Sequence, residues 1–138
     1  TTIMFDPEAS VKFEGDTGPY VLYAYARICS VLRKAAANAF DTPVDWDVLG
    51  TPEERDLAMR CADYGGVVRR AAAELDTSLL ASYLLDLAKA FSRFYRECSV
   101  LSAETPALVR ARLELSRRVQ AILGDGLHTL TIGTLDSM

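Results

Sequence analysis

The residues best suited to chemistry in this sequence are tyrosines and arginines at helical spacing. Tyr20 and Arg27 are seven residues apart, so two turns of a helix place both side chains on one face. Tyr95 lies near the end of a second predicted helix and can converge with them if the two helices pack side by side. Aromatic rings stack on unstacked bases and arginines hydrogen-bond to base edges, so these three side chains could bind single-stranded nucleic acid.

Each of these residues also has a structural interpretation. Tyr20 could pack on the segment that leads into its helix, and Tyr95 could be a core residue whose hydroxyl reaches a loop carbonyl. Arg27 could be a solvated surface charge. The spacing alone leaves both interpretations open.

The sequence contains no recognisable catalytic or metal-binding pattern. His128 is the one histidine, and no Cys–His or Ser–His–Asp set can be assembled around it. The glycines of EGDTG and GDG lack the lysine and the preceding strand of a phosphate-binding loop. Cys29, Cys61 and Cys98 match no zinc spacing, so we expect small buried or half-buried thiols in a reducing cytosol. We expect no catalysis, metal or cofactor in this chain.

Composition fits one folded domain. The chain has 138 residues, of which 50% are hydrophobic and 25% charged, enough for a single core. The net charge of −4 disfavours a nucleic-acid binder, although a local basic face can lie on an acidic domain. With no signal peptide and no apolar run of about 20 residues, we expect a cytoplasmic protein without membrane contact.

Hydrophobic periodicity predicts an all-α bundle of about five helices joined by short loops. The predicted helices cover 18–38, 51–63, 67–75, a central helix that begins at Asp76 or Thr77, and 106–123. Gly65 and Gly66 are expected to interrupt the chain between the second and third helices, and the run from Gly124 to Gly126 is expected to end the last one. The apolar tail after that run is expected to pack back on the bundle.

Three apolar stripes are expected to form the core. They comprise Val21, Tyr25, Ile28 and Leu32; Leu80, Leu84, Leu87, Phe91 and Tyr95; and Leu108, Ala111, Leu115, Val119 and Ile122. The second stripe is the widest, which predicts that its helix is central.

Two stretches resemble the C-terminal helical domain of arginyl-tRNA synthetases, which is named for a short Asp-Ala-Leu-Arg signature. The first is FEGDTGPYVLYAYARICSVLRKA at 13–35, close to the family pattern FEGDTGPYxQYAxARxxSxxRK. The second is LASYLLDLAKAFSRFYRECSVL at 80–101, followed by ARLELSRRVQAIL and GLHTLTI. The resemblance runs from about Phe5 to Met138.

Some positions depart from the family pattern. Leu22 stands where the family usually has glutamine, and Gly65–Gly66 where Pro-Glu is common. The usual ending, close to LLGIxxPERM, is LTIGTLDSM, with Thr131 in place of the glycine and residues 135–137 in place of Pro-Glu-Arg. The final Met138 is kept.

The resemblance implies an anticodon-binding domain of the class I synthetase type. The positions that match Tyr20, Arg27, Tyr95 and Met138 line the family's pocket for the anticodon loop, and Tyr23 and Arg33 are weaker candidates. Residues 1–17 are then a connector from a missing catalytic body, and 18–138 the helical domain.

The implied function is tRNA recognition for an arginine–tRNA ligase. Such an enzyme attaches arginine to its tRNA with ATP, and both small substrates would bind the missing catalytic domain. This chain would therefore not be an enzyme by itself. Its partners would be arginine tRNA and the catalytic domain of the same polypeptide, with no DNA and no membrane. The alternative is a free-standing helical interaction protein, derived from this domain, with no role in tRNA charging.

The basic residues of the last predicted helix have two interpretations. Arg110, Arg112, Arg117 and Arg118 could form a strip that contacts tRNA phosphates, together with Arg69 and Arg70. They could also form a solvated face paired with Glu114 and Glu74. The sequence does not decide between these possibilities.

Overall fold

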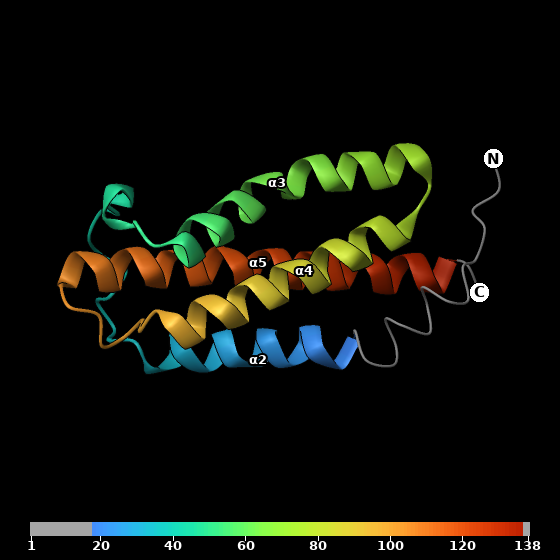
Figure 1. Cartoon of the computed structure of the whole chain (residues 1–138). Coiled ribbons are helices and arrows are strands. Elements are labelled where there is room, and N and C mark those ends of the chain that lie inside the picture. Colours follow the sequence, from blue (N-terminus) through green and yellow to red (C-terminus); the bar gives the residue numbers. More distant parts are fainter. Residues whose placement is uncertain (1–17, 137–138) are drawn as a thin grey trace.

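The computed structural model describes the backbone of residues 18–136 and the side chains of residues 18–131. The described chain forms four α-helices and one short 3-10 helix, without a strand (Figure 1). The elements are α2 (Gly18–Lys34), η2 (Trp46–Val48), α3 (Pro52–Glu74), α4 (Thr77–Glu97) and α5 (Pro106–Asp136). This confirms the predicted all-α bundle.

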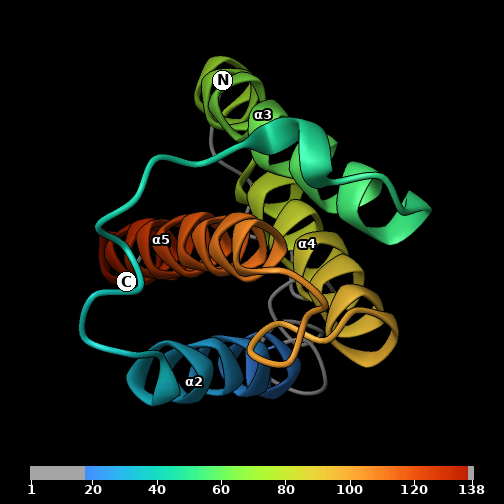
Figure 2. The same cartoon turned by 90° about the vertical axis from the view of Figure 1, so that its left-hand side faces the viewer.

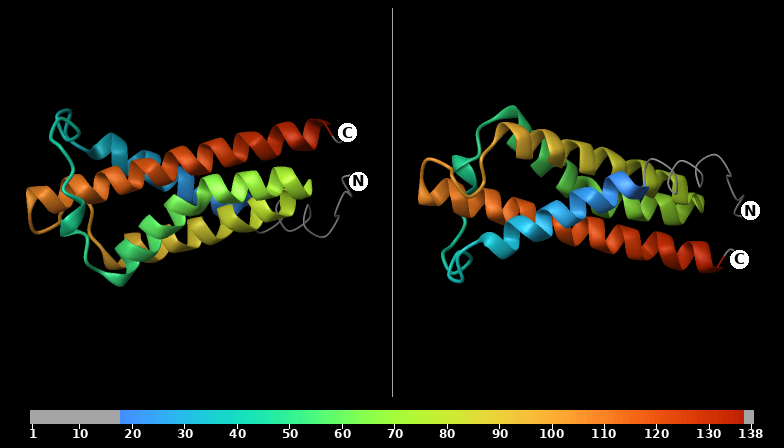
Figure 3. Two further views of the ribbon diagram at one scale, coloured as in Figure 1. Left: turned by 90° about the horizontal axis from the view of Figure 1, so that it is seen from above. Right: turned by 90° about the horizontal axis from the view of Figure 1, so that it is seen from below.

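The helices α4 and α5 form the centre of the bundle, and each contacts all three other helices. The helices α2 and α3 lie on opposite sides of this central pair (Figure 2). Seen from above and below, the α3–α4 hairpin and α5 extend along the same long axis (Figure 3). The C-terminal ends of α2 and α4 and the start of α5 lie together at one end of the molecule (Figure 1).

The predicted central helix is confirmed. Asp76 caps α4 by accepting a hydrogen bond from the Ser78 amide at 2.9 Å. Its apolar stripe is fully or nearly fully buried at Leu80, Leu84, Leu87, Phe91 and Phe94. Burial of each such side chain contributes about 1.5–3 kcal/mol, so this stripe is the main source of the core's stability.

Two predictions for the first half of the chain were wrong. The first helix ends at Lys34 instead of Asn38, and Phe40 beyond it packs against the core. Gly65 and Gly66 do not interrupt α3, which is continuous over 23 residues. A helical glycine costs about 1 kcal/mol, which packing against α4 offsets through partly buried residues such as Tyr64 and Val68.

The expected stop at Gly124–Gly126 was also wrong, because α5 continues to Asp136 and the tail is not a separate segment. These glycines lie where helices approach closely. A Cβ added to Gly126 would be 2.6 Å from Leu84 Cδ2 on α4, and one on Gly124 would be 3.3 Å from the Tyr25 ring on α2. Between residues 18 and 136 there are four α-helices instead of about five, because the predicted helices 51–63 and 67–75 are one continuous α3.

The cysteines match the expectation, with Cys98 buried and Cys29 and Cys61 half-buried, and all three thiols are free. Between residues 18 and 136, no helix combines the length and apolar character needed to cross a membrane.

The close approach at Gly126 yields a stability prediction. Gly126→Ala should destabilise the fold by about 1–2 kcal/mol, since overpacking costs about 1–3 kcal/mol and a better helix former recovers up to about 1 kcal/mol. The measurement is chemical denaturation. Gly66→Ala is the matched control, because its added Cβ would come no nearer than 3.9 Å to the Arg69 side chain. This control should be neutral or stabilising, and equal losses in both variants would contradict the packing role of Gly126.

Candidate functional site

The structure brings two of the sequence-predicted site residues into contact. The helices α2 and α4 pack against each other, and the Arg27 guanidinium carbon lies 5.1 Å from the centroid of the Tyr95 ring. Such a cation–π contact holds the guanidinium in place. Tyr95 is 40% exposed, so it lies at the edge of the core instead of inside it.

Tyr20 lies on the same side of α2, nearer to the start of the helix. Its hydroxyl donates to Ser92 Oγ on α4 at 3.2 Å, and 37% of the residue is exposed. Ser92 precedes Tyr95 by about one helical turn, so Tyr20 lies beside the Arg27–Tyr95 pair along α4. It does not line the pocket that contains that pair.

The Tyr95 ring has less free surface than the sequence suggested. Arg27 covers part of one face, and the Phe91 ring lies 6.0 Å away, centroid to centroid, at 35°. A base that binds at this position must stack on the guanidinium or displace it. Tyr23 is 77% exposed, more than any other aromatic residue of the described chain. It is therefore a stronger candidate for stacking than the sequence analysis, which placed it among the weaker candidates, indicated. Its position between the buried residues Val21 and Ala24, off the apolar stripe, was the available signal.

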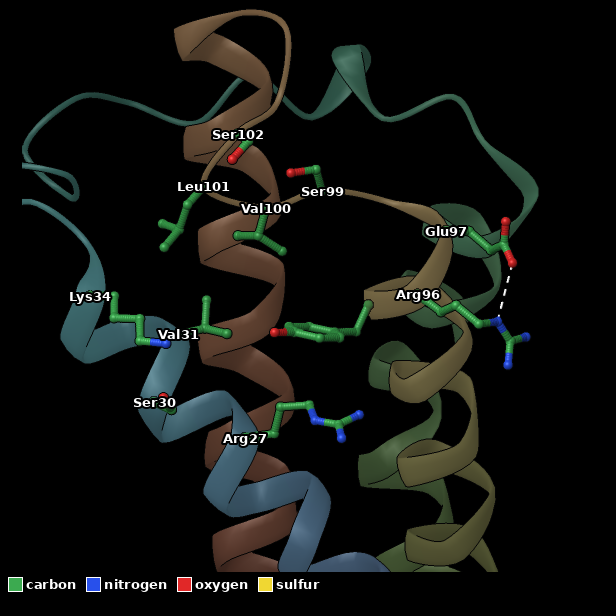
Figure 4. A pocket seen from close by; sticks show the side chains of 11 residues that line it. Arg27, Ser30, Val31, Lys34, Arg96, Glu97, Ser99, Val100, Leu101 and Ser102 are labelled. Carbon is green, nitrogen blue, oxygen red and sulfur yellow. Dashed lines mark hydrogen bonds and ion pairs between the residues drawn. The ribbon is translucent and has the colours of Figure 1, made fainter.

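Arg27 and Tyr95 line an open pocket of about 520 Å³ where α2 and α4 end (Figure 4). The α4–α5 connection forms its third wall. The lining residues are Arg27, Ser30, Val31 and Lys34 from α2; Tyr95, Arg96 and Glu97 from α4; and Ser99, Val100, Leu101 and Ser102 from the connection. The sequence analysis missed Lys34, Arg96 and the serines, because the approach of residues 99–102 depends on tertiary packing.

A buried ion pair fixes the third wall. Arg112 on α5 donates from Nε to Glu54 Oε2 at 2.8 Å and from Nη1 to the Ser99 carbonyl at 2.6 Å. Glu54 is 1% exposed, and its Oε1 accepts from the Thr51 amide at 2.9 Å and the Gly50 amide at 3.1 Å. Thr51 Oγ1 in turn accepts from the Glu54 amide, which completes a capping box at the start of α3.

The hydrogen bonds of the ion pair lower the pKa of its carboxylate. Burial alone would raise the pKa of Glu54, but hydrogen bonds from Arg112 and Thr51 outweigh it and lower the pKa below the ordinary value of 4.5. Burial likewise opposes a lowered pKa at Glu114, where hydrogen bonds from Arg117 and Arg110 outweigh it. Both carboxylates therefore stay charged at neutral pH.

The arginines of α5 are divided between the core and the surface, since Arg110 and Arg112 are buried whereas Arg117 and Arg118 are exposed. Arg110 is buried, pairs with Glu114 at 3.2 Å and donates to the Thr42 carbonyl at 2.7 Å. Arg117 pairs with Glu114 at 2.7 Å and lies over the Phe40 ring, and Arg118 lies over the Trp46 ring. With these contacts the arginines fix the α2–α3 connection on α5.

Like Tyr20 and Tyr23, another predicted site residue lies apart from the pocket. Arg33 is exposed at the end of α2 and does not line it. Met138 lies outside the described residues.

The chain is similar to proteins of one family over nearly its whole length. Residues 21–138 match the family model described as the DALR anticodon binding domain. An arginine–tRNA ligase of Pseudomonas putida is 41% identical over 97% of this chain, and one of Proteus mirabilis is 37% identical over 100%. An arginyl-tRNA synthetase structure from Thermus thermophilus superposes with a TM-score of 0.71 and 40% identity, over 90% of this chain and 21% of that one. The chain spans 23–24% of the length of these two curated relatives.

The buried pair at the pocket wall can be tested by removing one partner. Arg112→Met should destabilise the fold by about 3–5 kcal/mol, because it leaves the Glu54 carboxylate buried without its counter-charge. The Glu54→Gln/Arg112→Met double variant should lose less than the sum of the two single losses, as measured by urea denaturation. Strict additivity would mean that the two side chains do not interact in solution.

The lowered pKa of Glu54 also predicts a pH dependence. Its contribution is complete above the ordinary pKa of 4.5 and is lost as the pH falls through the lower folded-state pKa. Between about pH 6 and pH 3, Glu54→Gln should therefore lose less stability than the parent chain. Glu104→Gln is the control, since Glu104 is exposed and makes no ion pair within residues 18–136, and its profile should follow the parent. A parental profile in Glu54→Gln would contradict the assignment.

Proposed function

This chain belongs to the DALR anticodon-binding domain family, and we propose that it recognises the anticodon loop of arginine tRNA as a domain of an arginine–tRNA ligase. The observation that carries the proposal is the convergence of Arg27 and Tyr95 across α2 and α4. The similarity to arginine–tRNA ligases over nearly all of the chain supports the choice of tRNA.

The proposed recognition uses the exposed side of α2. Proteins bind anticodon loops by stacking the unpaired bases on aromatic or guanidinium planes and by hydrogen-bonding their edges. Tyr23 supplies a free ring, and Arg27, held on Tyr95, supplies a positioned cation with available N–H groups. Tyr20 extends the same surface toward the start of α2.

The catalytic step belongs to the rest of the proposed ligase. There, ATP and arginine would bind a catalytic domain, and this chain would contribute tRNA binding without chemistry of its own. A cytoplasmic location is part of the same proposal. The alternative of an interaction protein without a role in tRNA charging is not favoured, because the curated ligases match 97–100% of the chain.

The proposal predicts separable effects on affinity and stability at Tyr23. Tyr23→Ala should weaken binding to an anticodon stem-loop of arginine tRNA by about 1–3 kcal/mol, the usual loss for a base-stacking ring. The melting temperature should stay unchanged, because the ring is 77% exposed. Leu22→Ala is the control, since Leu22 is adjacent and 56% exposed but has no ring to stack, and it should bind normally. Equal binding by Tyr23→Ala and the parent chain would remove Tyr23 from the site.

A second prediction concerns the Arg27–Tyr95 pair. Arg27→Ala should weaken binding, and Arg27→Lys should restore it only in part, because an ammonium lacks the planar guanidinium on which a base can stack. Titrations with cognate and non-cognate stem-loops should show the loss for the cognate RNA. Full rescue by lysine would mean that Arg27 contributes only charge.

A further inference from the structure

Among the four described helices, α2 is the one that carries positive charge without any negative charge of its own. This helix contains Arg27, Arg33 and Lys34 and no acidic residue, in a chain of net charge −4. None of the three forms an ion pair among the side chains described at 18–131. On the other helices most basic residues are paired with carboxylates, namely Arg60, Arg70, Arg93, Arg96, Arg110, Arg112 and Arg117, whereas Arg55, Arg69, Lys89 and Arg118 are not.

Two of the α2 cations line the pocket with unused hydrogen-bond donors. Arg27 is positioned by the Tyr95 ring but donates no hydrogen bond within the described chain, and Lys34 likewise has no recorded acceptor there. Ser30 lies between them on α2, whereas Ser99 and Ser102 lie on the α4–α5 connection, on the far side of Val100 and Leu101 (Figure 4). Arg112 holds the Ser99 carbonyl from α5. The pocket thus presents donors to a ligand that accepts hydrogen bonds.

The net charge of the pocket favours an anion. Arg27, Lys34 and Arg96 provide three positive charges, and Glu97, which pairs with Arg96 at 3.2 Å, provides one negative charge. The C-terminal ends of α2 and α4 also point here and oppose an anion, each equivalent to about half a negative charge. About one net positive charge remains, which matches a phosphodiester group.

We propose that this pocket binds one backbone phosphate of the anticodon loop, with Lys34 and Arg27 as the principal donors and the Ser30 hydroxyl as a further donor. The inference rests on the proposed function and adds a role to it. Phosphate contacts set the register of a nucleic acid without reading its sequence. A phosphate held here would place the adjacent base against the Arg27–Tyr95 pair.

The test compares two exposed cations that form no ion pair among the described side chains. Lys34→Gln and Arg55→Gln each remove one charge, but only Lys34 lines the pocket, whereas Arg55 lies on α3, on the other side of the central pair of helices. With the full 138-residue chain and an anticodon stem-loop RNA, Lys34→Gln should lower the magnitude of the log–log salt slope by about 0.7, the value for one phosphate contact on a single strand. Its deficit relative to the parent should shrink about threefold between 50 and 200 mM salt. Arg55→Gln should keep the parental slope.

A change in the RNA identifies the phosphate itself. Uncharged methylphosphonate linkages are introduced one at a time around the loop, and one of them should cost at least as much as Lys34→Gln in the parent chain and less than that in the Lys34→Gln variant, where Arg27 alone of the two cations remains. Equal slopes for Lys34→Gln and Arg55→Gln, or additive losses at every linkage, would overturn the phosphate site while leaving anticodon binding in place. Failure of the parent chain to bind cognate RNA would overturn the proposed function and this inference with it.

Discussion

The buried contact between Glu54 and Arg112 is the constraint on which the functional end of this domain depends. One carboxylate caps α3 and pairs with α5, and the same guanidinium holds the Ser99 carbonyl of the α4–α5 connection. Burying two charges is costly unless every polar atom finds a partner. In the described part of the chain no buried side-chain nitrogen or oxygen is left without one. The pair therefore specifies a single arrangement of three chain segments, and one of them is a wall of the pocket.

Close packing explains the glycine at position 126 that sequence rules took for the end of a helix. Apolar periodicity was sufficient to predict α4 and a cap at Asp76 or Thr77, because a wide stripe and a local cap are properties of neighbouring residues, and the structure has the cap at Asp76. The space that Gly126 leaves on α5 is filled by Leu84, which lies 42 positions earlier in the sequence. A glycine that ends a helix and one that admits a neighbouring helix look alike in a sequence, so this distinction required the structure.

In the candidate site, too, some features follow from neighbouring residues and others from residues far apart in the sequence. The seven-residue spacing placed Tyr20 and Arg27 on one side of α2, and the contact between Arg27 and Tyr95 followed once α2 and α4 packed together. The exposure of Tyr23 could have been read from its position off the apolar stripe. The burial of Arg110 and Arg112 could not, because it depends on Glu54, Thr42 and Ser99 from distant parts of the chain.

Segregation of charge explains how a chain of net charge −4 can present a surface for RNA. Net charge sums over all residues, whereas a phosphate responds to the charges within about one Debye length, roughly 10 Å at 0.1 M salt. Carboxylates on α3 and α5 are matched to arginines that fix the fold, as Glu114 is to Arg110 and Arg117. Because α2 has no acidic residue, its cations have no such partner on their own helix. Acidic residues thus stabilise the scaffold through its structural arginines, and the basic residues of α2 remain available to a ligand.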